Sequence, residues 1–170
     1  MGRYRPPIPL SSPYVTSAGF NALQAEQDAL WKRRASVTRA LSAAAAEGDR
    51  SENAEYIYRK KELREIDRRI RYLQKRLPLL KIVTSTPSNP EQVFFGAWVT
   101  LEDAQGKEVR YRIVGPDELD TQKGWISMDA PLARALMKKR IDDAVDVIVD
   151  GQTRDYLILD ISYQSDSGDT

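Results

Sequence analysis

The sequence predicts an α+β protein: a long helical hairpin followed by a small module that contains a sheet. The hydrophobic period is helical up to about residue 80 and becomes two beyond residue 91. Charge divides at the same place. Residues 1–90 hold 17 Lys and Arg against 9 Asp and Glu, whereas residues 91–170 hold 9 against 16. Two halves of opposite sign indicate two modules with different partners.

Composition excludes several kinds of chemistry. The chain has no cysteine and no histidine, so disulfides, thiolates and the commonest general base are absent. Any catalysis must use carboxylates, hydroxyls, Lys, Arg or a metal held by oxygen. No apolar run reaches about 18 residues, so we expect no membrane span. The N-terminus lacks the pattern of a signal peptide, so we do not expect export.

The first helix is predicted after a proline-rich start. Residues 1–15 contain four prolines and predict an extended or disordered tail. Thr16 suits a helix N-cap. One heptad frame then places these residues on positions a and d: Phe20, Leu23, Leu30, Val37, Leu41 and Ala44. Good helix formers continue to the break at Gly48.

The second helix has the more regular seam, with Arg59 as its one charged occupant. The apolar seam positions are Tyr56, Leu63, Ile66, Ile70, Leu73, Leu77 and Leu80. Pro78 predicts a kinked or frayed end. Each helix of roughly 28 residues gives a rod near 40 Å long. We therefore expect an antiparallel coiled-coil hairpin over residues 16–84.

The remaining chain predicts a compact α+β module. Residues 85–90 are a linker by composition. Within the module, residues 91–163, we expect strands at 95–101, 109–114, 125–127, 145–149 and 156–163, and a short helix at 131–137. Pro131 suits the first turn of that helix. Residues 164–170 predict a disordered tail.

Two carboxylates stand at the predicted turn of the hairpin, Asp49 and Glu52. Mg²⁺ usually takes one or two protein carboxylates and completes its shell with other oxygens. These two acids supply such oxygens, but a partner would have to supply the rest. The alternative is a helix cap, with Asp49 as the N-cap and Glu52 reaching back. Spacing alone leaves both interpretations open.

Basic residues crowd the helix that follows the turn. Nine positive charges fall between residues 59 and 76, and only Glu62, Glu65 and Asp67 oppose them there. A solvated helix face is one interpretation, and contact with nucleic-acid phosphates is the other. The best candidates for nucleic-acid binding lie nearest the turn: Arg59, Lys60, Lys61 and Arg64.

The chain resembles the bacterial Gre transcript cleavage factors, of the GreB type. The turn segment carries much of the resemblance: Gly48-Asp49-Arg50-Ser51-Glu52-Asn53-Ala54-Glu55-Tyr56. Further matches lie at residues 63–73, 93–99, 112–115 and 131–136, and together they cover roughly 16–163 in order. The resemblance implies an N-terminal coiled coil and an FKBP-like α+β C-terminal domain with an antiparallel sheet.

The resemblance also implies a function. The hairpin tip would enter the secondary channel of bacterial RNA polymerase, while the C-terminal domain docks on the channel rim. There Asp49 and Glu52 would help to hold a shared Mg²⁺, which the polymerase mainly holds. The polymerase's own site would then cut backtracked RNA, whose extruded 3′ segment contacts the basic residues from Arg59 onward. The chain would be an accessory factor and not itself an enzyme, a monomer, and cytoplasmic.

Two alternatives remain. The first is a non-cleaving regulator of the same architecture that plugs the channel and inhibits polymerase; Asp49 and Glu52 argue against it. The second is a free-standing coiled-coil nucleic-acid-binding protein, which predicts salt-sensitive binding to naked RNA or DNA.

Overall fold

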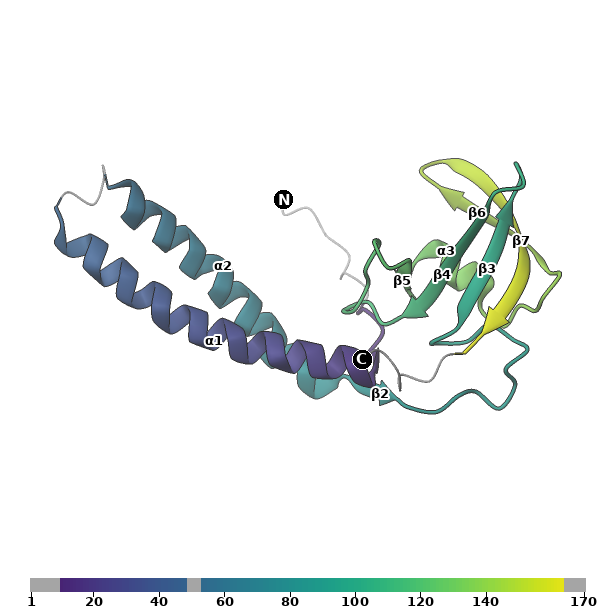
Figure 1. Cartoon of the computed structure of the whole chain (residues 1–170), viewed down its shortest axis with the longest axis horizontal. Coiled ribbons are helices and arrows are strands. Elements are labelled where there is room, and N and C mark those ends of the chain that lie inside the picture. The colour runs from purple at the N-terminus through teal and green to yellow at the C-terminus, as the bar shows by residue number, and fades with distance from the viewer. Residues whose placement is uncertain (1–9, 49–52, 164–170) are drawn as a thin grey trace, which may run out of the picture. The chain divides into compact units, whose positions relative to one another are not determined.

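The computed structural model describes residues 10–48 and 53–163, and the chain divides into two units. One unit, Ala18–Leu80, holds the helical hairpin. The other joins the N-terminal segment Met1–Ser17 to Lys81–Thr170 and holds the sheet. The predicted order of a helical hairpin and then an α+β domain is confirmed (Figure 1). In the described part of the chain, no helix is long and apolar enough to cross a membrane.

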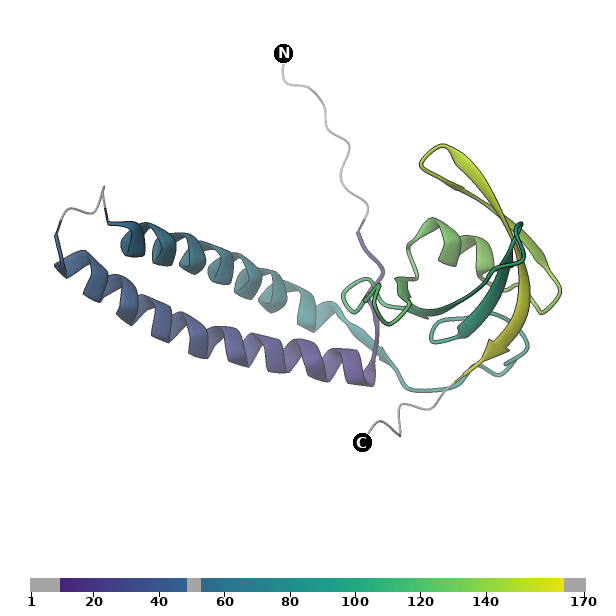
Figure 2. The same ribbon diagram turned by 45° about the horizontal axis from the view of Figure 1, so that its top comes forward.

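Two long helices make the hairpin. Helix α1, Ser17–Ala46, has 30 residues and helix α2, Ala54–Arg76, has 23. At 1.5 Å per residue they are about 45 and about 35 Å long. They run side by side in both views (Figure 1, Figure 2). Helix α2 passes into a 3₁₀ turn, η1 (Leu77–Leu79), which contains Pro78, so the irregular helix end predicted at this proline is confirmed.

The apolar seam of the hairpin uses the predicted a and d positions. Val37 of α1 and Ile66 and Ile70 of α2 form a buried cluster, against which Leu30 and Leu63 pack. Three more seam residues are also buried: Leu23, Ala44 and Leu73. Burying one such Leu or Ile contributes roughly 1.5–3 kcal/mol. The seam therefore fixes which faces of α1 and α2 meet.

Ion pairs between the helices flank this seam. Arg34 Nε donates to Asp67 Oδ1 at 2.7 Å. Arg69 Nε and Nη2 donate to the two carboxylate oxygens of Glu26 at 2.6 and 2.9 Å. Pairs as exposed as these contribute about 1 kcal/mol or less each. These ion pairs chiefly favour one register of the two helices and add little to their stability.

The sheet has five strands in the order β5-β4-β3-β7-β6. The strands are β3 (Trp98–Asp103), β4 (Glu108–Val114), β5 (Trp125–Ser127), β6 (Ala144–Val149) and β7 (Gln152–Ser162). The pairs β3–β4, β3–β7 and β6–β7 are antiparallel, as predicted, but β5 lies parallel to β4. The sheet is therefore mixed. A parallel pair needs a crossover connection, and residues 115–124 provide it.

An apolar core lies between the sheet and the short helix α3, Pro131–Leu136. Ala133 and Leu136 of α3 pack with Leu101, Ile113 and Ile158 of the sheet, and all five side chains are fully buried. Pro131 occupies the first turn of α3, as predicted.

The N-terminal segment belongs to the sheet unit. Strand β1, Tyr14–Thr16, pairs in parallel with β2, Lys81–Val83, and Val15 is fully buried. The Ser12 backbone N–H donates to the Asp129 carboxylate at 2.8 Å, and the Ser12 hydroxyl donates to the same group. Of the predicted extended or disordered tail over 1–15, the extended conformation is present in β1. Disorder is wrong for the described residues from Ser12 onward, because burial and pairing order them. Residues 1–9 and the predicted tail 164–170 lie outside the described residues.

Strand β1 is held by close contact with the loop after β4. The Glu118 carboxylate accepts hydrogen bonds from the Thr16 backbone N–H at 2.7 Å, the Thr16 hydroxyl at 2.5 Å and the Gly115 N–H at 3.1 Å. A Cβ added at Gly115 would lie 2.0 Å from the Tyr14 carbonyl oxygen. The hairpin unit, Ala18–Leu80, is accordingly shorter than the predicted 16–84, because residues 16–17 and 81–84 belong to the sheet unit.

Candidate functional site at the hairpin tip

The tip is the connection between α1 and α2. Helix α1 ends at Ala46, and Gly48 follows with φ of +137°, a backbone conformation that favours glycine. Helix α2 begins at Ala54. Asp49 and Glu52, the predicted catalytic and metal-binding residues, fall between these ends in sequence and lie outside the described residues.

The N-cap of α2 is Asn53. Its backbone is extended, with φ −81° and ψ 99°, and its Oδ1 accepts a hydrogen bond from the Tyr56 N–H at 3.1 Å. The alternative interpretation, in which Asp49 is the N-cap, is therefore wrong. Asparagine is among the strongest N-cap residues, and here it directly precedes the first helical residue. The cap of α2 does not require the two acids.

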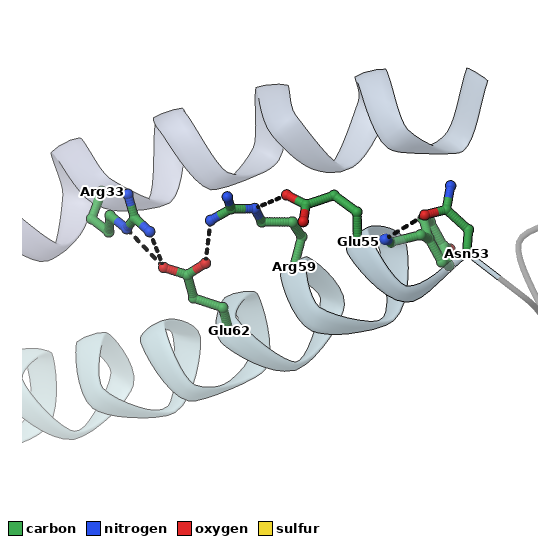
Figure 3. A network of polar contacts seen from close by, with 6 residues as sticks. Arg33, Asn53, Glu55, Arg59 and Glu62 are labelled. Carbon is green, nitrogen blue, oxygen red and sulfur yellow. Dashed lines mark hydrogen bonds and ion pairs between the residues drawn. The ribbon is translucent and has the colours of Figure 1, made fainter. Parts of the chain in front are cut away.

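Arg59 lies inside a polar network that joins the two helices (Figure 3). Its guanidinium donates from Nε to Glu55 at 2.7 Å and from Nη1 to Glu62 at 2.9 Å. Glu62 also accepts from Arg33 Nε of α1 at 2.7 Å. Arg59 and Glu62 expose only 24% and 18% of their side chains. This seam position thus accommodates a charge because two carboxylates surround it.

The network shifts the ionisation of its members. Hydrogen bonds to Glu55 and then Glu62 raise the pKa of Arg59 above its ordinary value. Desolvation is the largest single influence on Glu62 and acts to raise its pKa. The hydrogen bonds from Arg33 and Arg59 outweigh it together and lower the pKa of Glu62. Both shifts favour the charged forms of Arg59 and Glu62 near neutral pH.

The other predicted nucleic-acid-binding residues are placed differently from Arg59. Lys60, Lys61 and Arg64 are exposed, and none has an ion-pair partner within the described part of the chain. Lys60 Nζ lies 5.8 Å from the centroid of the Tyr56 ring. The structure thus separates one network arginine from three solvent-facing cations.

Two of these cations, Lys61 and Arg64, begin a stripe along the outer face of α2. Steps of three and four residues place its members on one face, and all are exposed: Lys61, Arg64, Arg68, Arg71 and Lys75. The acids Glu62 and Asp67 instead pair with arginines of α1. These ion pairs lie at the flanks of the seam. On the outer face the exposed Glu65 is the one remaining acid among residues 59–76, so that face keeps an excess of positive charge.

Sequence reasoning missed Asn53, Glu55 and Glu62 as residues that shape the tip. A signal was present for each. An Asn directly before a helical run is a typical N-cap. Glu55 and Glu62 stand four residues before and three after Arg59, the spacings at which helical side chains meet.

Comparisons with known proteins match both units. Residues 13–82 match the family "Transcription elongation factor, N-terminal", and residues 87–163 match "Transcription elongation factor, GreA/GreB, C-term". A Xanthomonas axonopodis pv. citri protein named Transcription elongation factor GreB is 56% identical over 167 residues, covering 97% of this chain and 99% of its own. Its Pseudomonas aeruginosa namesake is 54% identical over 164 residues, covering 96% and 98%. A solved GreA/GreB structure from Nitrosomonas europaea is 18% identical, covers 89% of this chain and 100% of its own, and has a TM-score of 0.41.

A helical hairpin joined to a small sheet domain, with family matches across both, defines a transcription elongation factor. The chain belongs to the GreA/GreB family, and its relatives place it with the GreB type. The resemblance read from the tip segment and the later motifs is thus confirmed.

Proposed function

We propose that this elongation factor binds bacterial RNA polymerase, inserts its hairpin tip into the secondary channel and stimulates cleavage of backtracked RNA 3′ ends. The cutting is done by the polymerase's own Mg²⁺-dependent site, so the factor is an accessory and not itself an enzyme. Arrested complexes would then resume elongation. The observation that carries the proposal is a hairpin of two long helices whose connection holds Asp49 and Glu52.

The tip offers the type of ligand that Mg²⁺ prefers, but two carboxylates are too few to complete its shell. Asp49 and Glu52 offer carboxylate oxygens, which Mg²⁺ prefers. Among the described residues, no three His, Cys, Asp or Glu side chains lie together as possible metal ligands. We therefore expect the polymerase to complete the shell of the ion. A second ion in phosphodiester cleavage helps to form the attacking hydroxide and to stabilise charge. Asp49 would contribute a ligand to this shared ion, and Glu52 would assist as ligand or by orienting water.

The length of the hairpin supports delivery of the tip to a buried site. Helix α2 alone extends about 35 Å, while its packing needs only a narrow apolar seam. A rod of this form suits entry into a narrow channel. Ion pairs such as Arg34–Asp67 and Arg69–Glu26 keep the two helices in register along it.

The outer face of α2 suits the extruded RNA segment. Lys60, Lys61 and Arg64 are exposed and lie nearest the tip, where phosphate contacts would be made. Arg59 was predicted with them, but its charge already serves Glu55 and Glu62. We assign Arg59 chiefly to holding the helices and the three exposed cations chiefly to RNA.

The sheet unit would dock on the rim of the polymerase channel. Its excess of acidic residues, 16 against 9 basic ones in residues 91–170, contrasts with the basic hairpin and supports a separate partner surface. We propose that the factor acts as a monomer in the cytoplasm, where its polymerase is found.

A cleavage assay tests the proposal. Stalled, backtracked elongation complexes are incubated with Mg²⁺, with and without the full-length factor, and RNA shortening is followed over time. We expect faster shortening with the factor. If shortening is no faster than with polymerase alone although the factor binds, the non-cleaving regulator is the better account.

Affinities for naked RNA and for polymerase distinguish the proposed function from a free-standing nucleic-acid-binding protein. It predicts tight, salt-sensitive binding to naked RNA and no co-purification with polymerase. The proposed function predicts the reverse, because the exposed cations of α2 would bind RNA usefully only after the sheet unit has docked. Binding to core polymerase and to naked RNA is measured at the same salt concentration.

A further inference from the structure

Asn53 makes side-chain contacts to both helices. Its Oδ1 accepts from the Tyr56 N–H of α2 at 3.1 Å, while its Nδ2 donates to the Ala44 carbonyl of α1 at 2.8 Å. Figure 3 shows Asn53 at the end of α2 that faces the tip. One amide therefore joins the last turn of α1 to the first turn of α2.

The α1 end has a need for such a donor. The last four carbonyls of a helix have no partner within the helix, and Ala44 is among the last residues before α1 ends at Ala46. No basic side chain stands in this last turn to satisfy them. The Ala44 carbonyl accepts from the Glu47 N–H at 3.3 Å as well as from Asn53. Asn53 thus supplies the shorter of its two hydrogen bonds.

Toward the tip, apolar packing from α2 becomes thinner, although Ala44 of α1 is still buried. The buried cluster of the seam reaches Leu63. Beyond it, the α2 seam positions are Arg59 and Tyr56, and neither belongs to the buried core. The bond from Asn53 to Ala44 therefore constrains the spacing of the two helix ends in a region where α2 contributes no buried side chain.

We propose that Asn53 is a positioning residue that clamps the ends of α1 and α2 and thereby sets the geometry from which the tip acts. Asparagine suits both tasks, since its amide carries an acceptor and donors on one short, planar group. The effect on cleavage rests on the function proposed above, whereas the clamp itself does not.

Two substitutions separate the clamp from the cap. Asn53→Ser keeps an N-cap oxygen, but its side chain is too short to reach the Ala44 carbonyl. Asn53→Asp keeps the length and the acceptor but has no donor. Thr38→Ala is the matched control, because it removes a hydrogen bond from a hydroxyl to the carbonyl of Arg34 within α1 only.

Two readouts then decide. The chain has no cysteine, so spin labels at Ser42→Cys and Ile57→Cys report the distance between the helices near the tip. We expect a broader distance distribution in both Asn53 variants and an unchanged one in Thr38→Ala. In the cleavage assay we expect both Asn53 variants to lose between about tenfold and a hundredfold in rate, as small misplacements at reacting centres do. Their polymerase affinity should stay within about twofold of wild type, because the other proposed contacts are intact.

The outcomes distinguish the clamp from the positioning role. An unchanged distance distribution would overturn the clamp. A broadened distribution with wild-type cleavage would overturn the positioning role, as would a loss of cleavage that parallels weaker polymerase binding. If the wild type itself does not stimulate cleavage, the proposed function fails, and the label distances still decide the clamp.

Discussion

Substituting Gly115 tests whether the N-terminal segment is an integral part of the sheet unit. An alanine Cβ there would lie 2.0 Å from the Tyr14 carbonyl oxygen and 3.1 Å from the Glu118 carboxylate. The first distance is far below van der Waals contact, and the neighbour is backbone that cannot rotate away. Gly115→Ala should therefore displace β1 from the loop that holds it.

The expected loss in the free energy of unfolding follows from the burial and hydrogen bonds that β1 contributes. Displacement exposes Val15, which is fully buried, at about 1.5–3 kcal/mol. The two hydrogen bonds from Thr16 to Glu118 are each worth about 1.5 kcal/mol or more, because the acceptor is charged. With partial relaxation, we expect the free energy of unfolding of the sheet unit to fall by about 3–5 kcal/mol.

Urea unfolding of the full chain measures this. In a Trp31→Phe background, the fluorescence of Trp98 and Trp125 reports the sheet unit. Gly106→Ala is the control: Gly106 has φ of +77° but no atom within 4 Å of an added Cβ, so only backbone strain of about 1 kcal/mol is expected. Equal effects of the two substitutions would refute the close-packing argument.

Three further predictions concern the hairpin. Leu73→Ala, at a fully buried seam position, should lower the thermal stability of the hairpin by about 2–5 kcal/mol, whereas Leu79→Ala, 61% exposed, should be nearly neutral in the same circular-dichroism melt. The pKa of Glu62 is lower in the folded chain than its ordinary value of 4.5, so its stabilisation is present above that value and is lost as pH falls through the folded pKa. The difference in unfolding free energy between wild type and Glu62→Gln should thus be about 0.5 kcal/mol near neutral pH and vanish in acid; a difference that persists in acid would contradict the ion-pair account. Replacing Lys61 and Arg64 together by Gln should reduce the salt dependence of binding to backtracked complexes, by about 0.7 in the log–log slope for each phosphate that is no longer neutralised; an unchanged slope would argue that these cations do not bind RNA.

The helices and the longer strands could be predicted from the sequence because their hydrophobic residues recur at a regular spacing. The spacing of Leu63, Ile66, Ile70 and Leu73 identifies a helix and its buried face, and the structure buries or half-buries these residues. Strands β3, β4, β6 and β7 are long enough to show alternation. Strands β1 and β2 have three residues each, too few to establish a period, and prolines precede β1.

Contacts between distant segments account for what the sequence could not predict. The parallel pairing of β5 with β4 depends on the path of a loop, which local patterns do not encode. At the site, helix spacing places Lys60, Lys61 and Arg64 off the apolar seam, so their exposure could be predicted from the sequence. The bond from Asn53 to Ala44 joins the ends of two helices, and its formation depends on how the hairpin closes.

The central claim is that the tip donates charge to a metal site in the polymerase, and Asp49→Asn tests it most directly. Asparagine is close to aspartate in shape but lacks the charge that a metal ligand needs, and Asn53 caps α2 in either case. The rate of RNA cleavage in backtracked complexes is measured across a Mg²⁺ titration, with polymerase binding measured in parallel. The account predicts unchanged binding and a cleavage rate that falls toward that of polymerase alone. Wild-type cleavage by Asp49→Asn at every Mg²⁺ concentration would contradict it.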